Sequence, residues 1–417
     1  MNERRLLILL TNYYPYYKGE EYIENEISVA SNNFDEILIV PTMATRKMPL
    51  TRVIPKNSST INLDISYSIM GRLKMMIWGA PEYLMNKKVH EDAKLSMKKR
   101  LYAFYYQART EFVYSAIKNN KEIKKITDKY NESNITIYSY WLHITASVSV
   151  RIKERIFHNQ SRCIARGHRY DLYDYAAPCK YIPDRRFMLE RIDKVYACSN
   201  DGAEYLKKHY GRFAEKIDVG RLGTIDHGIC RCTRTPCFSI VSCSAIREVK
   251  RLDRIIDIIA KLLQKGYQVK WMHLGDGPYM RKIEELAQKT LPEDRYCFKG
   301  RLDNSMLFDW YDSNEVSCFV NLSDSEGVPV AIMEAMSCGI PIVATDVGGT
   351  REIVEDGKNG YVISTNCSNE EMANAIERII NVCENDYANL CTMSRKIWEK
   401  RCNAQGLYET FYLDIIS

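Results

Sequence analysis

Long apolar runs are missing from this sequence. A helix that spans a bilayer needs about 20 consecutive apolar residues, and the chain has no run of that length. The first apolar run, Leu6–Leu10, follows Arg4 and Arg5 and ends at Thr11. It is shorter than the stretch of about 7–15 apolar residues that a signal peptide requires. We therefore expect neither a membrane span nor a signal peptide, and we predict that Leu6–Leu10 is a buried β-strand.

An excess of charge of one sign is also missing. The 59 Lys and Arg residues face 53 Asp and Glu, so the formal net charge is only +6 over 417 residues. Averaged over the chain, this excess is too small to indicate nucleic-acid binding. Apolar residues make up 46% and charged residues 27%, which is typical of globular proteins and argues against disorder or a coiled coil. The length corresponds to two or three domains.

Cysteine is absent before Cys163, although the chain has 14 cysteines. Without an export signal, we expect free thiols in a reducing cytoplasm. Cys230, Cys232 and Cys237 lie close together with His227 nearby, but zinc sites usually need a second pair of ligands. We expect incidental thiols and no metal, with metal binding as the weaker alternative.

Short apolar runs alternate with longer segments of helical spacing. This alternation predicts βαβ units and a parallel sheet. Besides 6–10, we expect strands over 37–40, 135–138, 162–166, 194–197, 238–243, 269–274, 317–322 and 340–344. The expected helices cover 20–30, 104–119, 251–265, 279–289, 329–337 and 398–416, and another opens at Gly348–Thr350. The repeated pattern predicts two α/β domains, over 1–230 and 236–395, with 396–417 crossing back to the first domain.

An insertion at about 60–130 interrupts the first domain and concentrates positive charge. From Asn86 to Lys129, 12 Lys and Arg face 5 Asp and Glu, a net +7 that exceeds the charge of the whole chain. Aromatic residues interleave with this charge. One interpretation is a surface that meets anionic lipid or a lipid-linked acceptor, and its candidate residues are Lys98, Lys99, Arg100 and Tyr105. The other is a solvated helix pair with a core-facing aromatic stripe.

The clearest chemical signal is SDSEGVPVAIMEAMSCGIPIVATDVGG, residues 323–349. Glu326 follows an expected strand, and ligands of open α/β sheets bind outside the carboxyl ends of the strands. The next N–H groups open a helix, where anions are favoured. Glu334 can accept hydrogen bonds from two vicinal hydroxyls. Phosphate and hydroxyl sites side by side predict a sugar-nucleotide site, and two surface glutamates around an ordinary loop are the alternative.

This stretch resembles the EGxPxxxxEAM pattern of retaining GT-B glycosyltransferases of family 4. The resemblance continues through LGDGP (Leu274–Pro278), FKGR (Phe298–Arg301) and GKNGYVI (Gly357–Ile363). It is weaker at YYPYYKGEEYIENEI (Tyr13–Ile27) and RGHRYDLYDY (Arg166–Tyr175), which are similar to motifs of exopolysaccharide and colanic-acid-type enzymes. It implies a GT-B fold, in which two Rossmann-like domains face each other across a cleft.

The resemblance also implies an activity. The expected enzyme moves a sugar from a UDP- or GDP-linked donor to a hydroxyl of a glycan or lipid-linked acceptor in surface polysaccharide biosynthesis. It would retain the anomeric configuration, use no cofactor or metal, and work in the cytoplasm, at the inner face of the cell membrane. A GT-B sugar-nucleotide epimerase and a non-catalytic glycan- or lipid-binding protein are the alternatives. A Rossmann dehydrogenase is disfavoured, because GxGxxG does not follow the first strand.

The family implies a role for individual residues. Glu334 would bind the donor ribose, and Glu326 would contact the transferred sugar. His168 would lie near that sugar, with a satisfied loop histidine as the alternative. Gly19 would let the N-terminal loop approach the diphosphate without a Cβ, and Glu20 or Glu21 would lie on the acceptor side. Further donor-binding candidates are Gly327, Val328, Pro329, Val330, Asp276 and Arg301.

One position departs from the family pattern. The family holds the diphosphate with an Arg and, five positions later, a Lys. Lys250 fits the Lys, but Ala245 stands where the Arg is expected. A cation is needed there because the departing diphosphate gains negative charge. Arg247 or Arg251 would replace the missing Arg, and a salt bridge on the helix surface is an equal alternative for each.

Overall fold

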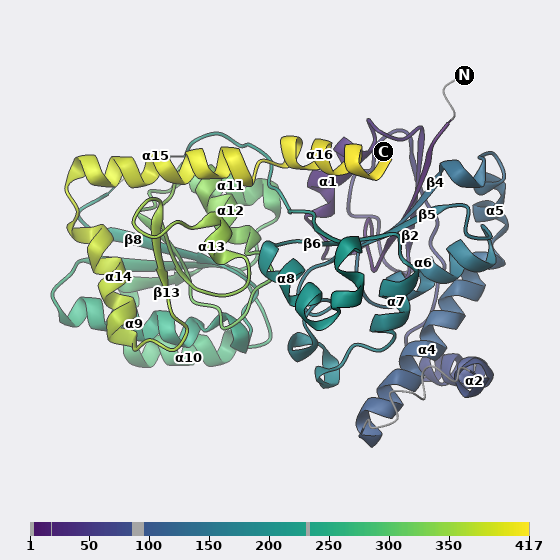
Figure 1. Cartoon of the computed structure of the whole chain (residues 1–417). Helices are drawn as coiled ribbons and strands as arrows, with labels where there is room; N and C mark the ends of the chain where they lie inside the picture. The colour runs from purple at the N-terminus through teal and green to yellow at the C-terminus, as the bar shows by residue number, and fades with distance from the viewer. Residues whose placement is uncertain (1–3, 18, 86–95, 231–233, 417) are drawn as a thin grey trace. The chain divides into compact units, whose positions relative to one another are not determined.

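The computed structural model describes residues 4–17, 19–85, 96–230 and 234–416, and it divides into two compact units (Figure 1). Unit 1 comprises Met1–Arg221 together with Tyr408–Ser417, and unit 2 comprises Leu222–Leu407. The division lies a few residues before residue 230, where we expected the first domain to end. Each unit is built on its own parallel sheet.

The sheet of unit 1 has the strand order β3-β2-β1-β4-β5-β6-β7. Every recorded strand pair in it is parallel, with Leu6 of the first strand opposite Glu36 on one side and Ile135 on the other. The central strands form from continuous apolar runs because helices cover both faces. Their bounds are β1 (Leu6–Thr11), β2 (Glu36–Pro41), β3 (Ser58–Thr60), β4 (Ile135–Ser139), β5 (Arg162–Gly167), β6 (Lys194–Ala197) and β7 (Ile217–Val219).

Helices of unit 1 connect these strands (Figure 1). The helix expected from residue 20 begins only at Ile23, because Glu20 adopts a positive φ of 60° and its carboxylate serves the preceding turn. The helices are α1 (Ile23–Ala30), α2 (Ile69–Met85), α4 (Met97–Lys118), α5 (Lys121–Thr127), α6 (Ile144–Arg155), α7 (Arg185–Arg191) and α8 (Asn200–His209). Helix α16 (Ala404–Ile416) begins in unit 2 and belongs to unit 1 from Tyr408 onward.

Unit 2 repeats the plan with the strand order β10-β9-β8-β11-β12-β13. Its strands are β8 (Phe238–Cys243), β9 (Val269–Leu274), β10 (Tyr296–Phe298), β11 (Cys318–Asn321), β12 (Ile342–Thr345) and β13 (Gly360–Ile363). Its helices are α9 (Leu252–Gln264), α10 (Met280–Thr290), α11 (Asn304–Ser313), α12 (Val330–Ser337), α13 (Thr350–Ile353), α14 (Asn369–Asn381) and α15 (Glu384–Arg401).

The C-terminal segment is two helices, so the expectation of one helix over 398–416 is wrong. Helix α15 ends at Arg401, and α16 begins at Ala404. The break is held by backbone bonds in which Thr224 N donates to Cys402 O (2.8 Å) and Ala404 N donates to Thr224 O (3.0 Å). From Tyr408 onward the chain belongs to unit 1.

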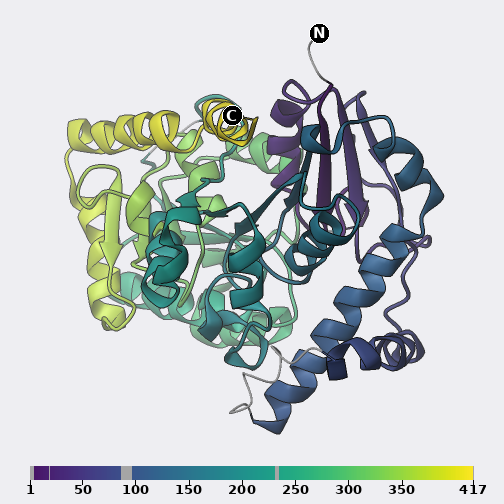
Figure 2. The same cartoon turned by 45° about the vertical axis from the view of Figure 1, so that its right-hand side comes forward.

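Within the described residues, the insertion of unit 1 contains the helices α2 and α4, which lie side by side (Figure 2). Gly79 permits the close crossing, since a Cβ there would lie 2.4 Å from Ala108 Cα. The aromatic residues Tyr106 and Tyr114 of α4 are buried in the core. The core-facing interpretation therefore applies to these two side chains. Among the described residues, no helix is long and apolar enough to cross a membrane.

Helix α2 carries several exposed apolar side chains, which the sequence did not lead us to expect. Ile69, Met70 and Ile77 are 82%, 74% and 77% exposed, and Leu73 lies between them with 48%. The spacing of Ile69, Leu73 and Ile77 places them along one stripe of the helix. Of the candidate lipid-binding residues on α4, Lys98 and Arg100 are exposed, whereas Lys99 and Tyr105 are half-buried. Residues 86–95 of the basic segment lie outside the described residues.

Candidate functional site

Glu326 forms an ion pair with Lys250 at the carboxyl edge of the unit 2 sheet. Lys250 ends the turn after β8, and Glu326 lies in the turn between β11 and α12. Lys250 Nζ lies 2.6 Å from Glu326 Oε1. Glu326 is 8% exposed, whereas the Lys250 side chain keeps 23% of its surface accessible. The structure thus brings together two of the residues for which the sequence predicted a role at the donor.

The turn that carries Glu326 is held by neighbouring polar side chains. Asn321 Oδ1 accepts hydrogen bonds from Ser323 N (3.1 Å) and Oγ (2.6 Å), and its Nδ2 donates to Glu326 Oε1 (3.4 Å). Thr345 Oγ1 donates to Ser323 O (2.6 Å). The loop after β12 also packs closely here, because a Cβ on Gly348 would lie 2.3 Å from Glu326 O. Asn321 was not predicted from the sequence, where it is recognisable only as a polar residue at the end of an expected strand.

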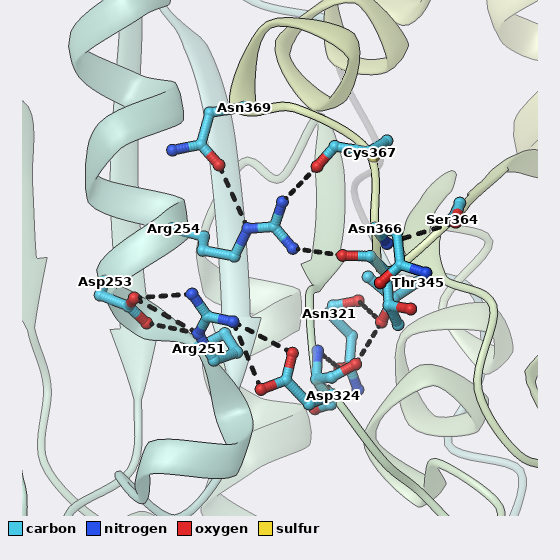
Figure 3. Close-up of polar contacts among 12 residues, drawn as sticks. Arg251, Asp253, Arg254, Asn321, Asp324, Thr345, Ser364, Asn366, Cys367 and Asn369 are labelled. Atoms are coloured by element: carbon cyan, nitrogen blue, oxygen red, sulfur yellow. Dashed lines mark hydrogen bonds and ion pairs between the residues drawn. The ribbon is translucent and has the colours of Figure 1, made fainter.

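The two candidate substitutes for the missing Arg have different surroundings. Arg251 donates to Asp324 (3.1 Å) and Asp253 (3.0 Å), so two carboxylates already compensate its charge (Figure 3). Arg247 is exposed and lines a cavity of about 550 Å³ together with Arg251 and Tyr279. Arg251 therefore forms salt bridges, which the sequence analysis gave as the alternative to a donor-binding role.

A buried arginine fixes the loop beside this turn. Arg254 on α9 is 8% exposed and donates to the backbone oxygens of Thr365 (2.9 Å) and Cys367 (2.5 Å) and to Asn369 Oδ1 (3.1 Å). Figure 3 shows these bonds reaching from α9 to the loop that follows β13. The hydrogen bonds of the Arg254 guanidinium therefore connect α9, the first helix of unit 2, to the segment that follows β13.

The remaining donor-side candidates lie in neighbouring loops of unit 2. Glu334 is a half-buried residue of α12, and Gly327, Val328 and Pro329 precede that helix, which begins at Val330. The loops with Asp276 and Arg301 are joined, since Gly275 N donates to Gly300 O (2.7 Å). Gly275 has a φ of 142°, and a Cβ there would lie 1.9 Å from Ser244 O. The motif glycine thus allows the loops after β8 and β9 to pack together.

In unit 1, a buried carboxylate organises the loop that carries His168. Asp171 is fully buried and accepts hydrogen bonds from the backbone N–H groups of Leu142 (2.9 Å), His168 (2.9 Å) and Arg169 (3.1 Å). Burial alone would raise the pKa of Asp171, but His168 and these N–H groups lower it below its usual value. Asp171 therefore fixes the loop after β5 as a charged group.

The His168 ring lies among aromatic side chains. Its centroid is 4.6 Å from that of Trp141 and 5.0 Å from that of Tyr140. The nearest carboxylate oxygen is 3.6 Å from Nδ1, on Asp171. The residue is only 7% exposed, and within the described part of the chain neither ring nitrogen has a hydrogen-bond partner. Nδ1 faces the Asp171 carboxylate, so Nε2 is the ring nitrogen that is left available for a ligand.

The Glu20 carboxylate holds together the turn that follows β1. Its carboxylate accepts hydrogen bonds from the backbone N–H groups of Asn12 (2.9 Å), Tyr13 (2.7 Å) and Tyr14 (2.7 Å), and from Trp141 Nε1. Glu20 is 6% exposed, so these donors account for its charge. The neighbouring Gly19 has a φ of 98°, which by itself favours glycine at this position.

The region around Cys230 contains thiols in contact. His227 stacks on Phe308 with ring centroids 3.6 Å apart. Cys230 Sγ lies 2.7 Å from Cys338 Sγ, and Cys232 lies outside the described residues. Across the described ranges, no group of three or more His, Cys, Asp or Glu is arranged to hold a metal ion.

Two Rossmann-like units with parallel sheets define a GT-B protein, and comparisons with solved structures support this class. The lipopolysaccharide outer core galactosyltransferase WaaB in its apo form matches with a TM-score of 0.66 at 14% identity, over 99% of both chains. Anabaena Alr3699/HepE in complex with UDP and glucose matches with a TM-score of 0.67 at 17% identity, over 100% of both chains. The predicted GT-B fold class is confirmed.

The sequence of unit 2 is similar to a known family. Residues 237–392 match the family described as Glycosyl transferases group 1. This match lies within unit 2 and agrees with the resemblance seen in the sequence. A relative is the putative colanic acid biosynthesis glycosyltransferase WcaL of Salmonella typhimurium, which is 26% identical over 248 residues. The match covers 58% of this chain and 60% of WcaL, so the chain spans about three fifths of the length of this curated relative.

Proposed function

We propose that the protein is a glycosyltransferase that moves a sugar from a nucleotide sugar to a hydroxyl of a glycan or lipid-linked acceptor. The observation that carries the proposal is the Lys250–Glu326 pair in a group 1 domain, with Glu334 on the helix that follows. The WcaL match supports a role in polysaccharide biosynthesis. The HepE complex favours UDP as the nucleotide.

In the proposed reaction, Lys250 and the N–H groups that open α12 stabilise the negative charge of the departing diphosphate. Glu326 holds hydroxyls of the transferred sugar, and Glu334 holds the ribose. The acceptor hydroxyl attacks from the face that the diphosphate leaves, so the anomeric configuration is retained. The diphosphate oxygen takes the acceptor proton. Protein cations supply the positive charge, so we expect turnover to survive EDTA.

A panel of UDP-, GDP-, ADP- and CDP-sugars tests the donor in a thermal-shift assay. We expect one nucleotide to stabilise the protein, and we expect Glu334→Ala to weaken its binding at least about 100-fold, because two hydrogen bonds to a charged acceptor are lost. Isothermal titration measures the change. Glu399→Ala is the control, since Glu399 is half exposed and pairs only locally with Arg395 on α15.

Equal donor affinity in wild type, Glu334→Ala and Glu399→Ala would contradict the donor site. Transfer separates the proposal from its alternatives. An epimerase converts the sugar nucleotide without an acceptor, and a non-catalytic protein binds it without releasing nucleoside diphosphate. The proposed transferase releases nucleoside diphosphate in proportion to acceptor glycosylated, and proton NMR of the product reports the anomeric configuration.

We further propose that unit 1 meets an anionic membrane through helix α2 and the start of α4. The exposed stripe Ile69, Leu73 and Ile77 supplies apolar area. Arg72 and Lys74 are exposed on the same helix, and Lys98 and Arg100 on the next. A helix with apolar residues flanked by basic ones lies in the interface of anionic bilayers. The proposal thus combines the predicted basic residues with an apolar stripe seen only in the structure.

Flotation with vesicles of phosphatidylcholine and phosphatidylglycerol tests this surface. We expect Leu73→Glu/Ile77→Glu, and separately Lys98→Glu/Lys99→Glu/Arg100→Glu, to abolish most of the flotation. The control Lys121→Glu/Lys124→Glu/Lys125→Glu makes the same change of charge on α5 and should retain most of it. Flotation that falls equally in the control would show an effect of net charge, and flotation unchanged in all three variants would refute the surface.

A further inference from the structure

The two thiols of Cys230 and Cys338 lie within unit 2 at a distance unusual for unbonded sulfur atoms. Their sulfurs are 2.7 Å apart, against about 2.05 Å in a disulfide. Cys338 follows the last turn of α12 and is fully buried, whereas Cys230 is partly accessible. Both are free thiols in this structure. A small movement of the two sulfur atoms would allow a disulfide bond to form between them.

Independent contacts hold the segment before Cys230 against the end of α12. Arg395 donates to both carboxylate oxygens of Asp226, at 2.9 and 2.6 Å, and also to Ser337 O at 2.7 Å. Ile229 is a near neighbour of Gly339, since Ile229 Cγ2 lies 3.9 Å from the place of a Cβ on that glycine. The proximity of the sulfurs is therefore part of an extended packed contact.

We propose that Cys230 and Cys338 are a redox modification site that forms a reversible disulfide. The bond would staple the segment at the start of unit 2 to the C-terminal end of α12, the helix that carries Glu334. It does not depend on the proposed glycosyl transfer. The oxidant is a low-molecular-weight disulfide of the glutathione class.

The environments of the two thiols give them different roles in the exchange. The hydrogen bond with Cys338 lowers the pKa of Cys230, and the positive Arg395 acts in the same direction against desolvation and the charge of Asp312. The hydrogen bond with Cys230 and burial raise the pKa of Cys338. Cys230 is thus the thiol that ionises and reacts first, and Cys338 is the resolving thiol.

The steps balance as thiol–disulfide exchange. The Cys230 thiolate attacks one sulfur of the small disulfide, forming a mixed disulfide and releasing one small thiolate. Cys338 loses its proton and attacks the Cys230 sulfur, which forms the protein disulfide and releases the second small thiolate. Two protein thiols are oxidised, one small disulfide is reduced to two thiols, and the protons end on those thiols.

Peptide mass spectrometry of the full chain tests the proposal. Folded protein is equilibrated with a series of oxidised and reduced glutathione ratios, quenched in acid, alkylated and digested without reductant. We expect a peptide pair linked through Cys230 and Cys338 that disappears on reduction and in Cys230→Ser. Cys318→Ser, which removes a buried thiol of the same unit, should leave the link in place.

Two outcomes would overturn the proposal. One is stable glutathione on Cys230 without the linked pair, and the other is a link from Cys338 to Cys232 or Cys237 in place of Cys230. A thermal melt gives a second readout, because a cross-link between distant residues constrains the unfolded chain. Oxidised wild type should melt several degrees above its reduced form, and Cys230→Ser should show no such difference.

Discussion

Glu326→Gln is expected to lower kcat about 100- to 1,000-fold and to change the donor Kd by less than about threefold. The substitution keeps the shape of the side chain and removes its charge. The carboxylate pairs with Lys250 at 2.6 Å and accepts a hydrogen bond from Asn321 at 3.4 Å. A neutral amide no longer offers the hydroxyls of the transferred sugar the charged acceptor that we propose for Glu326. Steady-state release of nucleoside diphosphate, with donor titration, measures both quantities.

Asp324→Asn is the matched control for this prediction. Asp324 lies in the same turn, and its carboxylate pairs with Arg251 on the side of α9. We expect its kcat to remain within about threefold of wild type, since an exposed ion pair contributes at most about 1 kcal/mol. Equal losses in both variants would mean that the turn as a whole, and not the Glu326 charge, supports turnover. Unchanged kcat in Glu326→Gln would contradict the assigned role.

The expected strands formed where the sequence has continuous apolar runs. Runs such as Leu6–Leu10 are buried on both faces, and this environment requires such residues. The strands that the sequence did not reveal are short and lie away from the sheet centres. Ser58–Thr60 is wholly polar, and Ile217–Val219 contains a single buried residue. A helix pair was one interpretation of the insertion, but the range of α2 was not predicted because Pro81 and two glycines weaken its helical pattern.

Residues of the candidate site could be predicted where each belongs to a short sequence pattern. Lys250 and Glu326 were each assigned from local patterns, and the structure pairs them. Asn321 and Arg254 were not predicted, because their partners depend on how distant loops pack. Glu20 was expected near the acceptor, yet its oxygens accept hydrogen bonds from a turn that only the folded chain brings around it. Local sequence indicates which residue types are present, but not which donors reach them.

Glu26 and Arg166 form a fully buried ion pair, and we expect its loss to lower the stability of unit 1 strongly. Glu26 on α1 is 1% exposed, and its Oε2 lies 2.5 Å from Nη1 of Arg166 on β5, which is fully buried. Tyr412 of α16 donates to Glu26 Oε1 at 2.9 Å, and the Arg166 guanidinium lies 4.2 Å from the Phe411 ring centroid. The pair therefore joins the first helix, a central strand and the C-terminal helix within unit 1.

Glu26→Ala is expected to destabilise unit 1 by about 3–5 kcal/mol, because it leaves the buried Arg166 charge without a partner. Hydrogen exchange of β5 peptides, followed by mass spectrometry, measures the opening free energy of unit 1 in the whole chain. This choice avoids treating two units as a single two-state transition. Glu24→Ala is the control on the same helix, since its partly exposed pair with Arg52 contributes about 1 kcal/mol.

A double substitution distinguishes the unpaired charge from lost packing. Glu26→Leu/Arg166→Met replaces both charges with apolar side chains, so we expect it to recover much of the stability lost in Glu26→Ala. If the double variant is less stable than Glu26→Ala, the hydrogen bond to Tyr412 and the packing around Phe411 account for the effect. If Glu26→Ala and Glu24→Ala lose the same free energy, the buried pair does not hold the C-terminal helix on unit 1.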